Sequence, residues 1–575
     1  MLDFRIRNVR KPLISDFSGR RNFLRFFMMT CMLILVGRAI DLQVFNKQFL
    51  KEEGDKRQVD DVTVSAYRGM IKDRNGEPLA ISTPVESVGI NPRELKFLKD
   101  EQLMQIEKLL SLPAGKIKEL VKQYAQRQFI YIARRVNPQI SEQVKALKLD
   151  GVYFEREFKR FYPAGAVSAH LVGFTDFEDV GQEGMEYLYE AQLKGSEGSK
   201  RVIRDGQRRI IEDIENIKEP ISGKNIELSI DQRIQYLAYR ELQLAVSLNK
   251  AKSGALVVLD AKNGEILAAV NQPSFNPNTK SSLTEGSHRN RALTDIFEPG
   301  STVKPFVVAA ALDGGYVSPT SMFVTNGTYQ VGRNTVKDVH NYGTLDLTHV
   351  IKKSSNIGVS MMSLKMPPKY LWSIYHKLGF GVSAGSGFPG EANGTIRDYK
   401  KWNDFDRAIM SFGYGFNSSA LQLARAYTAL ADDGILHSVS LLKREEDDHP
   451  VRVFSAKTAK SVRQMMETVL MKDGTAYEAR VDGYTAAGKT GTVKKASAGG
   501  YTEKNYFAVF AGMAPATDPR LIIVVMIDEP SAGQYYGGLV SAPVFSKVMA
   551  GALRILDVAP DQKETMPILL SKKTH

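Results

Sequence analysis

The segment nearest the N-terminus constrains this chain most, because a basic leader runs directly into an apolar stretch. Residues 1–25 hold seven Arg and Lys residues against two Asp residues, and residues 26–37 hold no charged residue. This charge bias predicts that the N-terminus stays in the cytoplasm and that the rest of the chain lies across a membrane. Any globular domain is therefore expected to form from the residues that follow.

The uncharged run is 12 residues long, which is short for a membrane span and resembles the core of a signal peptide. Extended from Phe23 to Val44, it reaches membrane length if Arg25, Arg38 and Asp41 lie near the interfaces. No small-x-small cleavage pattern follows it. We therefore expect an uncleaved single-pass anchor rather than a removed signal, and a buried soluble helix agrees poorly with the basic leader.

The composition is that of a globular protein, since 43% of the 575 residues are hydrophobic and 25% are charged. The net charge is +13, but the chain has no nucleic-acid-binding motif and its basic residues are spread out. We expect an ordinary solvated surface instead, or one that faces an acidic polymer or an anionic membrane. The single cysteine, Cys31, excludes an internal disulfide, and the eight histidines lack metal-ligand spacing, so no metal is expected.

Two regions with different patterns of apolar and turn residues follow the anchor. The first mixes short strands, such as those around the Asn75-Gly76 turn, with amphipathic helices predicted at 101–112 and 116–125. In the second, hairpins at 255–270 and 507–527 enclose helical segments, which predicts an α+β domain with one antiparallel sheet flanked by helices. A polar stretch near 205–225 marks the boundary. The expected order is a basic leader (1–22), an anchor (23–44), a pedestal region (45–220), a C-terminal domain (221–557) and a polar tail (558–575).

Ser301 and Lys304 belong to the first of three short motifs, Glu-Pro-Gly-Ser-Thr-Val-Lys. Pro and Gly mark a helix start, so the two residues are expected on one helix face, three positions apart. The helix N-terminus depresses the pKa of a lysine, and a neutral amine beside a serine activates its hydroxyl as a nucleophile. The pattern is weak alone, because Ser247 and Ser440 also precede a lysine by three positions, where we expect ordinary surface residues.

The second motif, Lys-Ser-Ser-Asn, carries Ser354 and Asn356. The hydroxyl can relay a proton and the amide can hold a peptide backbone, although a helix N-cap explains the same residues. The third motif, Lys489-Thr490-Gly491-Thr492, lies in a stretch predicted as a loop that enters an edge strand. A lysine charge and two threonine hydroxyls suit recognition of a terminal carboxylate, and the glycine allows close approach.

A rival interpretation of the third motif is a nucleotide-binding loop. Residues 483–490 match the P-loop pattern, and the apolar run that ends at Asp528 resembles a magnesium-binding strand. A P-loop, however, needs an apolar strand before it and a helix that starts at its lysine. The preceding residues are polar, and Gly491 follows the lysine at once. We therefore reject the nucleotide-binding interpretation.

The three motifs, in this order, resemble those of the penicillin-binding serine acyltransferases. Flanking sequence sharpens the resemblance to class B penicillin-binding proteins, in particular the division (septal) D,D-transpeptidases. The similarity covers almost the whole chain from the anchor to about residue 557, and the stretches that carry it are Arg68–Gly76, Arg160–Gly165, His170–Thr175, Gly184–Glu186, Phe297–Phe306 and Tyr535–Phe545.

This resemblance implies a role for each motif residue. Ser301 attacks the penultimate D-alanine of a D-Ala-D-Ala stem peptide, Lys304 takes its proton, and Ser354 relays it to the leaving group. Backbone N–H groups of Ser301 and Thr492 form the oxyanion hole, and Asn356 orients the peptide. Four tyrosines are implied as cleft-lining residues, with simple edge packing left open for each, and the substrate-binding set is Asn356, Lys489, Thr490, Gly491, Thr492, Tyr414, Tyr506, Tyr535 and Tyr536.

The same resemblance implies β-lactams as ligands, no cofactor, and a catalytic domain in the periplasm, anchored in a bacterial inner membrane. It also implies a lipid-linked glycan polymerase and other division proteins as partners. The alternatives are a D,D-carboxypeptidase and a non-catalytic β-lactam-binding scaffold. A class A β-lactamase is disfavoured because no Glu-x-x-Leu-Asn stretch lies between the second and third motifs. The third motif has Thr490 where some division enzymes have serine, which keeps the hydroxyl.

Overall fold

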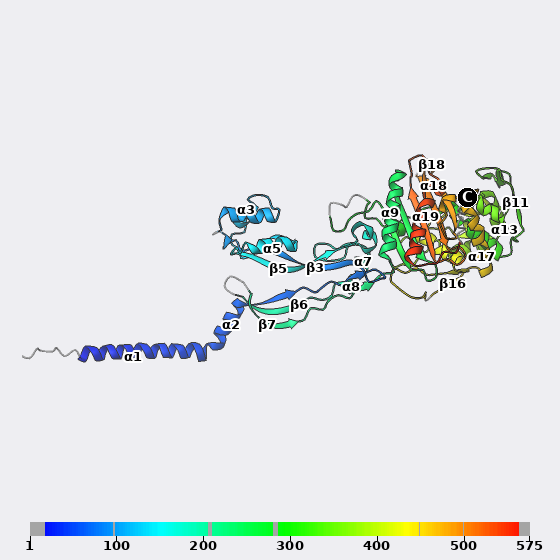
Figure 1. The fold of residues 1–575 in the computed structure, drawn as a ribbon. Coiled ribbons are helices and arrows are strands. Elements are labelled where there is room, and N and C mark those ends of the chain that lie inside the picture. The colour runs from blue at the N-terminus through cyan, green and yellow to red at the C-terminus, as the bar shows by residue number, and fades with distance from the viewer. Residues whose placement is uncertain are drawn as a thin grey trace, which may run out of the picture.

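The computed structural model describes residues 18–95, 98–204, 210–279, 286–447, 449–497 and 500–562. Figure 1 shows an elongated molecule with a long helix at one end and a globular domain at the other. Most of the predicted leader (residues 1–17) and of the predicted tail (residues 563–575) lies outside the described residues.

The N-terminal helix α1 (Ser18–Ile40) continues through a π-helical turn (Asp41–Phe45), and α2 (Lys47–Gln58) follows. The stretch Ser18–Phe45 is 28 residues long, its most apolar 18-residue segment has a mean hydropathy of 1.8, and it is long and apolar enough to cross a membrane. Arg38 and Asp41 form an ion pair within it. Because these two charges neutralise each other, they do not prevent the apolar helix from extending beyond the 12 uncharged residues.

The pedestal region contains two sheets, which separate into two arms in Figure 1. One is a three-stranded antiparallel sheet of β1 (Val59–Val64), β6 (Gly198–Arg204) and β7 (Ile210–Lys218). The other is built on the long strand β3 (Pro78–Ile90), and its other strands are β2 (Ile71–Lys72), β4 (Ile130–Val136), β5 (Val152–Phe161) and β8 (Ile226–Glu227). A separate apolar core forms where helices cover this second sheet, and these helices are α3 (Asp100–Leu109), α4 (Lys116–Gln123) and α5 (Pro138–Ala146).

Residues 68–76 attach the pedestal region to the C-terminal domain. Glu186 is fully buried and accepts hydrogen bonds from Arg68 at 2.8 Å and Arg160 at 2.6 Å. Arg74 pairs with the buried Glu265 of the C-terminal domain at 3.0 Å. These contacts explain why the stretches of the pedestal region that resemble the family contain the charged residues Arg68, Arg160 and Glu186. Three short helices complete this junction: α6 (Ala169–Val172), α7 (Gly184–Leu188) and α8 (Glu190–Leu193).

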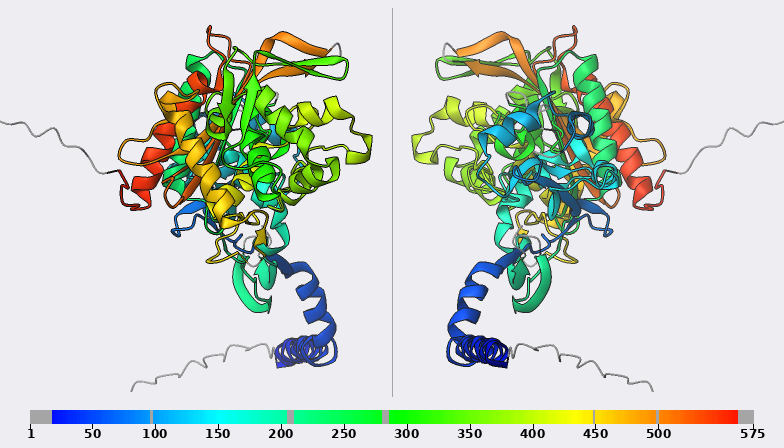
Figure 2. Two further views of the ribbon diagram at one scale, coloured as in Figure 1. Left: turned by 90° about the vertical axis from the view of Figure 1, so that its right-hand side faces the viewer. Right: turned by 90° about the vertical axis from the view of Figure 1, so that its left-hand side faces the viewer.

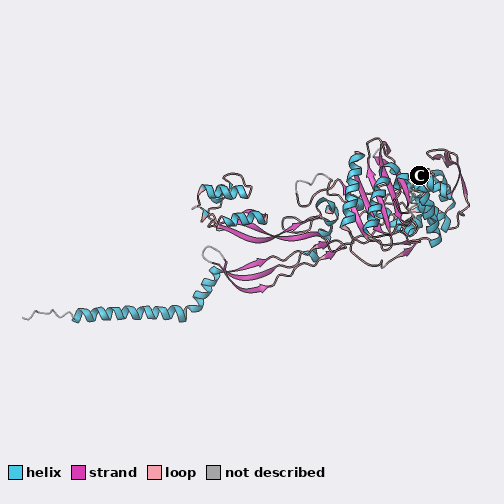
Figure 3. Cartoon of the chain, in the orientation of Figure 1, coloured by secondary structure: helices cyan, strands magenta, loops and turns pink. Residues whose placement is uncertain are grey.

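A five-stranded antiparallel sheet organises the C-terminal domain, as the two hairpins predict. Its order is β10-β9-β19-β18-β17, and the bounds are β9 (Ser253–Asp260), β10 (Ile266–Gln272), β17 (Ala487–Ser497), β18 (Gly500–Ala514) and β19 (Leu521–Asp528). Every residue of β9, β10 and β19 is buried. Strands that are apolar on both faces need cover on both faces, and the colouring in Figure 3 shows helices packed around the strands.

Helices α9 (Gln232–Leu248) and α19 (Ala542–Ile555) cover one face of this sheet, and helices from the middle of the chain cover the other (Figure 2). The helices that contact this second face are α10 (Arg291–Thr294), α16 (Ala420–Ala431) and α17 (Ala456–Glu467). Five further helices pack outside them, and these are α11 (Lys304–Asp313), α12 (Leu347–Lys352), α13 (Asn356–Lys365), α14 (Pro368–Lys377) and α15 (Asp404–Met410). The remaining elements are α18 (Gly537–Val540) and the short strands β11 (Met322–Thr325), β12 (Thr328–Val331), β13 (Asn334–Lys337), β14 (Gly343–Asp346), β15 (Ile435–Leu436) and β16 (Val451–Arg452).

Candidate active site

Ser301 lies in a 3₁₀ turn (Gly300–Val303) that leads directly into α11. The sequence predicts a helix start here with Ser301 and Lys304 on one helix face, and the structure has a 3₁₀ first turn before the α-helix begins at Lys304. Close backbone packing explains the tight turn. A Cβ on Gly413 would lie 2.1 Å from the carbonyl oxygen of Gly300, and a Cβ on Gly300 would lie 2.4 Å from Val493 of β17. The turn is thus held between a loop and the edge strand of the sheet.

Lys304 is completely buried, and its amine points to the second motif. Its Nζ donates hydrogen bonds to the carbonyl oxygen of Ser354 at 2.6 Å, to Ser354 Oγ at 3.2 Å and to Asn356 Oδ1 at 2.7 Å. Burial lowers the pKa of Lys304 to about 7, against the opposing charge of Asp338. A large fraction of this amine is therefore neutral near pH 7 and able to accept a proton.

The second motif forms a strained turn ahead of α13. Ser354 has φ +58°, a left-handed conformation that costs a non-glycine residue about 1–2 kcal/mol. The helix N-cap is Ser355, whose hydroxyl accepts a hydrogen bond from Gly358 N at 2.9 Å. The capping explanation of this motif therefore applies to Ser355, which leaves Ser354 and Asn356 available to Lys304.

Asp338 is a site residue that the sequence analysis missed. Its carboxylate accepts hydrogen bonds from Ser355 Oγ at 2.5 Å, from Asn356 N at 2.5 Å and from Ile357 N at 3.1 Å. It thus satisfies the first N–H groups of α13 and sets the orientation of the second motif. The only signal in the sequence is one aspartate directly after a short strand, which is too common to be diagnostic.

The third motif lies within β17, not in a loop as the sequence analysis predicts. Strand β17 is the edge of the sheet, so among the described residues no strand pairs with its outer side, and an extended peptide can pair there. Lys489 is completely buried, and burial together with the nearby charge of Lys304 lowers its pKa well below the ordinary value. Because this lysine sits inside a strand, the structure agrees with the rejection of a nucleotide-binding loop.

Thr475 is a second residue that the sequence analysis missed. Its hydroxyl lies 3.0 Å from that of Thr490, and the pair forms a hydrogen bond. The hydroxyl of Thr490 is thereby oriented by a side chain from the segment between α17 and β17. No local pattern marks Thr475 in the sequence, because its partner lies 15 positions away.

Two glycines allow α18 to sit directly against the third motif. A Cβ on Gly537 would lie 2.4 Å from the carbonyl oxygen of Gly491, and a Cβ on Gly538 would lie 2.1 Å from that of Thr475. Gly537 N also donates a hydrogen bond to Thr492 Oγ1 at 3.1 Å. The Tyr-Tyr-Gly-Gly segment therefore supplies both aromatic rings and the close backbone contact that positions β17.

Three of the four predicted tyrosines form one aromatic stack. Ring centroids of Tyr506 and Tyr535 lie 4.3 Å apart, and those of Tyr535 and Tyr536 lie 4.5 Å apart. Tyr414 comes from a different loop, and its hydroxyl makes a hydrogen bond with the backbone of Lys494 in β17. The tyrosines thus gather along the edge strand.

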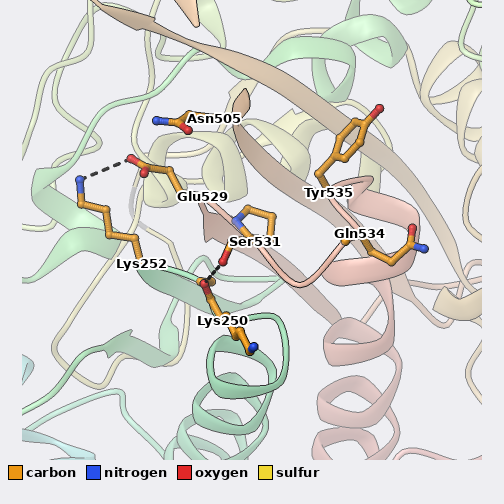
Figure 4. Close-up of a pocket in the computed structure, with 10 residues that line it drawn as sticks. Lys250, Lys252, Asn505, Glu529, Ser531, Gln534 and Tyr535 are labelled. Atoms are coloured by element: carbon orange, nitrogen blue, oxygen red, sulfur yellow. Dashed lines mark hydrogen bonds and ion pairs between the residues drawn. The ribbon is translucent and has the colours of Figure 1, made fainter. Parts of the chain in front are cut away.

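A polar pocket of about 550 Å³ lies beside this stack and shares Tyr535 with it. Figure 4 shows Lys252 paired with Glu529, and Ser531 hydrogen-bonded to the backbone of Lys250. Backbone N–H groups of Ser531 and Ala532 also bond to the carbonyl oxygen of Asn249. The end of α9 therefore anchors the loop that carries Tyr535.

Comparison with known proteins agrees with this geometry. Residues 254–550 match the family model described as the penicillin-binding protein transpeptidase domain, and residues 63–228 match the penicillin-binding protein dimerisation domain. This protein therefore belongs to the family of penicillin-binding proteins with a transpeptidase domain, and the resemblance and the α+β fold class predicted from the sequence are confirmed.

Within that family, the relatives have more specific names. The chain is 43% identical over 560 residues to the probable peptidoglycan D,D-transpeptidase PenA of Neisseria meningitidis, which covers 97% of this chain and 96% of the relative. It is 41% identical over 535 residues to the peptidoglycan D,D-transpeptidase FtsI of Escherichia coli, with 92% and 91% covered. Penicillin-binding protein 3 of Mycobacterium tuberculosis, solved in complex with aztreonam, is 28% identical with a TM-score of 0.69, covering 87% of this chain and 98% of that one.

Proposed function

We propose that this protein is a peptidoglycan D,D-transpeptidase that cross-links stem peptides during septal cell-wall synthesis. One observation carries the proposal. Lys304 directly follows the turn that holds Ser301, and its buried amine bonds to Ser354 and Asn356. A desolvated amine beside a serine is the arrangement that activates a hydroxyl for acyl transfer. The names of its PenA and FtsI relatives support the same reaction and the septal role.

The first half of the reaction forms an acyl-enzyme on Ser301. Its Oγ attacks the carbonyl carbon of the penultimate D-alanine while Lys304 accepts the hydroxyl proton. Backbone N–H groups of Ser301 and Thr492 bind the oxyanion, where one donor is worth about 10²–10³ in rate. The carbon–nitrogen bond then breaks, and the terminal D-alanine leaves with a proton that Ser354 passes to its amine.

In the second half, the amine of a neighbouring stem peptide attacks the acyl carbonyl. The new peptide bond forms, and Ser301 regains its proton through Lys304. The terminal carboxylate of the donor is held by Lys489, Thr490 and Thr492. Burial disfavours the charged form of the Lys489 amine, and the negative charge of this carboxylate favours it. Asn356 binds the peptide backbone, Gly491 allows its close approach to β17, and the four tyrosines flank it. A β-lactam acylates Ser301 in the same way, because its ring amide takes the place of the D-alanyl peptide bond.

The helix Ser18–Phe45 supports a location in the membrane, because it is long and apolar enough for a single span. The basic leader favours a cytoplasmic N-terminus. The catalytic domain then lies on the outer side of a bacterial inner membrane, in the periplasm, where its substrate is. The pedestal region is available to a lipid-linked glycan polymerase and to other division proteins, which are the partners that this location suits.

The test is acylation of the full-length chain in detergent by a fluorescent penicillin, with mass spectrometry to locate the adduct. We expect a stable adduct on Ser301, which Ser301→Ala abolishes. Ser247→Ala is the matched control, because Ser247 also precedes a lysine by three positions but lies exposed at the end of α9. Absence of an adduct on Ser301 would leave a scaffold that lacks acyl-transfer chemistry.

A second assay separates the transpeptidase from a D,D-carboxypeptidase. The full-length protein is incubated with a synthetic peptide that ends in D-Ala-D-Ala and with a labelled D-amino acid as the acceptor amine. Transfer of the acyl group to the labelled amine is expected. Release of the shortened peptide alone, with no labelled product, would assign the protein to the carboxypeptidases.

A further inference from the structure

Lys353, the residue directly before Ser354, reaches a loop that leads to the third motif. Its Nζ donates a hydrogen bond to the carbonyl oxygen of Asp473 at 2.8 Å and lies 3.5 Å from the Asp473 carboxylate. Lys352 pairs with the other oxygen of the same carboxylate at 2.7 Å. Two consecutive residues at the end of α12 therefore hold one point of the loop between α17 and β17.

The other end of this loop contacts the third motif. Asp473 precedes Gly474 and Thr475, and Thr475 bonds to the hydroxyl of Thr490. The loop itself is compact: Gly474 N donates to the carbonyl oxygen of Met471 at 2.8 Å, and a Cβ on Gly474 would lie 2.2 Å from the carbonyl oxygen of Val469. A shift at Asp473 is therefore transmitted to Thr475 over two peptide bonds.

Lys353 also borders the strained position of the second motif. Ser354 keeps φ +58°, and a strained conformation persists only where its surroundings hold it. On the C-terminal side, Asp338 holds Ser355 and Asn356. On the N-terminal side, the contacts of Lys353 and Lys352 with Asp473 provide the corresponding constraint.

We propose that Lys353 is a positioning residue that couples the second motif to the third through Asp473. The proposal rests on the proposed acyl-transfer function of this site. Lys353 keeps Ser354 in place for Lys304 and, through the 471–475 loop, keeps Thr490 at a set distance across the cleft. It touches neither the substrate nor the reacting atoms, and it acts by fixing two substrate-binding segments relative to each other.

The contacts of Lys353 predict an effect on geometry rather than on folding. The Lys353 side chain is 30% exposed and that of Asp473 is 61% exposed, and ion pairs this accessible to water add little to stability. Misplacement of a catalytic group by a fraction of an ångström, in contrast, lowers a rate strongly. The expected result is a slower reaction in a chain whose melting temperature is unchanged.

The test compares Lys353→Met, which removes the donor but keeps the aliphatic stem, with Lys353→Arg, which restores a donor and the charge. Lys377→Met is the matched control, because Lys377 is an exposed lysine at the end of another helix, α14. The full-length proteins are compared by their acylation by a fluorescent penicillin. We expect the maximal acylation rate of Lys353→Met to fall about tenfold, with a smaller change in the penicillin concentration that gives the half-maximal rate. Lys353→Arg should recover most of the lost rate. Lys377→Met should acylate at the rate of the unmodified chain.

Hydrogen–deuterium exchange of the same proteins is the readout that does not depend on activity. We expect Lys353→Met to exchange faster both in residues 354–358 and in residues 471–476, while Lys377→Met leaves both unchanged. Unchanged exchange in either segment would overturn the coupling, whatever the acylation result. If both segments loosen but the unmodified chain forms no adduct on Ser301, the coupling stands and the proposed function fails instead.

Discussion

Lys304 and Asp338 are joined through a single residue, Asn356. The amine of Lys304 bonds to the side-chain oxygen of Asn356 at 2.7 Å, and the backbone N–H of Asn356 bonds to the Asp338 carboxylate at 2.5 Å. Burial lowers the pKa of Lys304 to about 7, and the charge of Asp338 works in the opposite direction. Asp338 therefore supports the geometry of the site while it limits how far burial can depress that pKa.

The first prediction concerns the pH dependence of acylation. Neutral Lys304 is the form that accepts a proton, so the second-order acylation rate constant should rise with pH through about 7. Because the Asp338 charge raises the pKa of Lys304, Asp338→Asn should move this ascending limb to lower pH. Asp398→Asn serves as the control, since Asp398 caps only a short exposed turn. A limb that stays in place, or that moves to higher pH, would contradict this electrostatic role.

The second prediction concerns Thr475. Thr475→Val removes the hydroxyl that bonds to Thr490 at 3.0 Å and keeps the shape of the side chain. Loss of one such hydrogen bond costs about 0.5–1.5 kcal/mol, so the second-order acylation rate constant should fall about twofold to tenfold. Thr475→Ser keeps the hydroxyl and should stay close to the unmodified rate. Equal rates for the valine and serine variants would show that the hydroxyl has no part in binding.

The third prediction tests the packing of α18 against β17. A Cβ on Gly537 would lie 2.3 Å from the carbonyl oxygen of Val509 and 2.4 Å from that of Gly491. Gly537→Ala must therefore displace α18 or β17, at a cost of about 1–3 kcal/mol, and it should lower both the melting temperature and the acylation rate. Gly54→Ala is the control, because a Cβ there meets no atom within 4 Å. If Gly537→Ala behaved like this control, α18 would have no part in positioning the third motif.

Local pattern predicts the sheet strands well and their order poorly. The uniformly apolar runs of β9 and β19 are visible in the sequence, and so is the turn at Asn263-Gly264 between β9 and β10. The insertion of β19 between β9 and β18 is not visible, because it depends on pairing between residues more than 250 positions apart, such as Leu521 with Asp260. The third motif, predicted as a loop that enters an edge strand, lies in the strand itself, because it pairs with β18.

The same difference between local pattern and long-range pairing applies to the candidate site. Ser301, Lys304, Ser354 and Asn356 could be predicted because short motifs keep them together in the sequence. Asp338 and Thr475 could not, since each joins the site through a hydrogen bond to a residue 15 to 18 positions away with no repeating pattern. Lys353 lies within a motif, but its partner Asp473 is 120 positions distant. Residues that position others are thus revealed only once the chain is folded.

The last prediction concerns the junction between the pedestal region and the C-terminal domain. Glu265 is fully buried and pairs with Arg74 at 3.0 Å, while Arg74 itself is 20% exposed. Arg74→Met removes the charge that compensates a buried carboxylate, which costs about 1–3 kcal/mol. The two parts should then separate more readily, and limited proteolysis of the full-length protein should release the C-terminal domain faster.

Arg233→Met is the matched control for this junction. Arg233 also pairs with a buried carboxylate, that of Asp231, but its side chain is 57% exposed against 20% for Arg74. Its removal should therefore change the cleavage rate little. The penicillin acylation rate of Arg74→Met should also stay close to that of the unmodified chain, because the partner of Arg74, Glu265, belongs to none of the three motifs. Equal cleavage of both variants would mean that other contacts, such as the bond from Gln232 N to Asp73, hold the junction without Arg74.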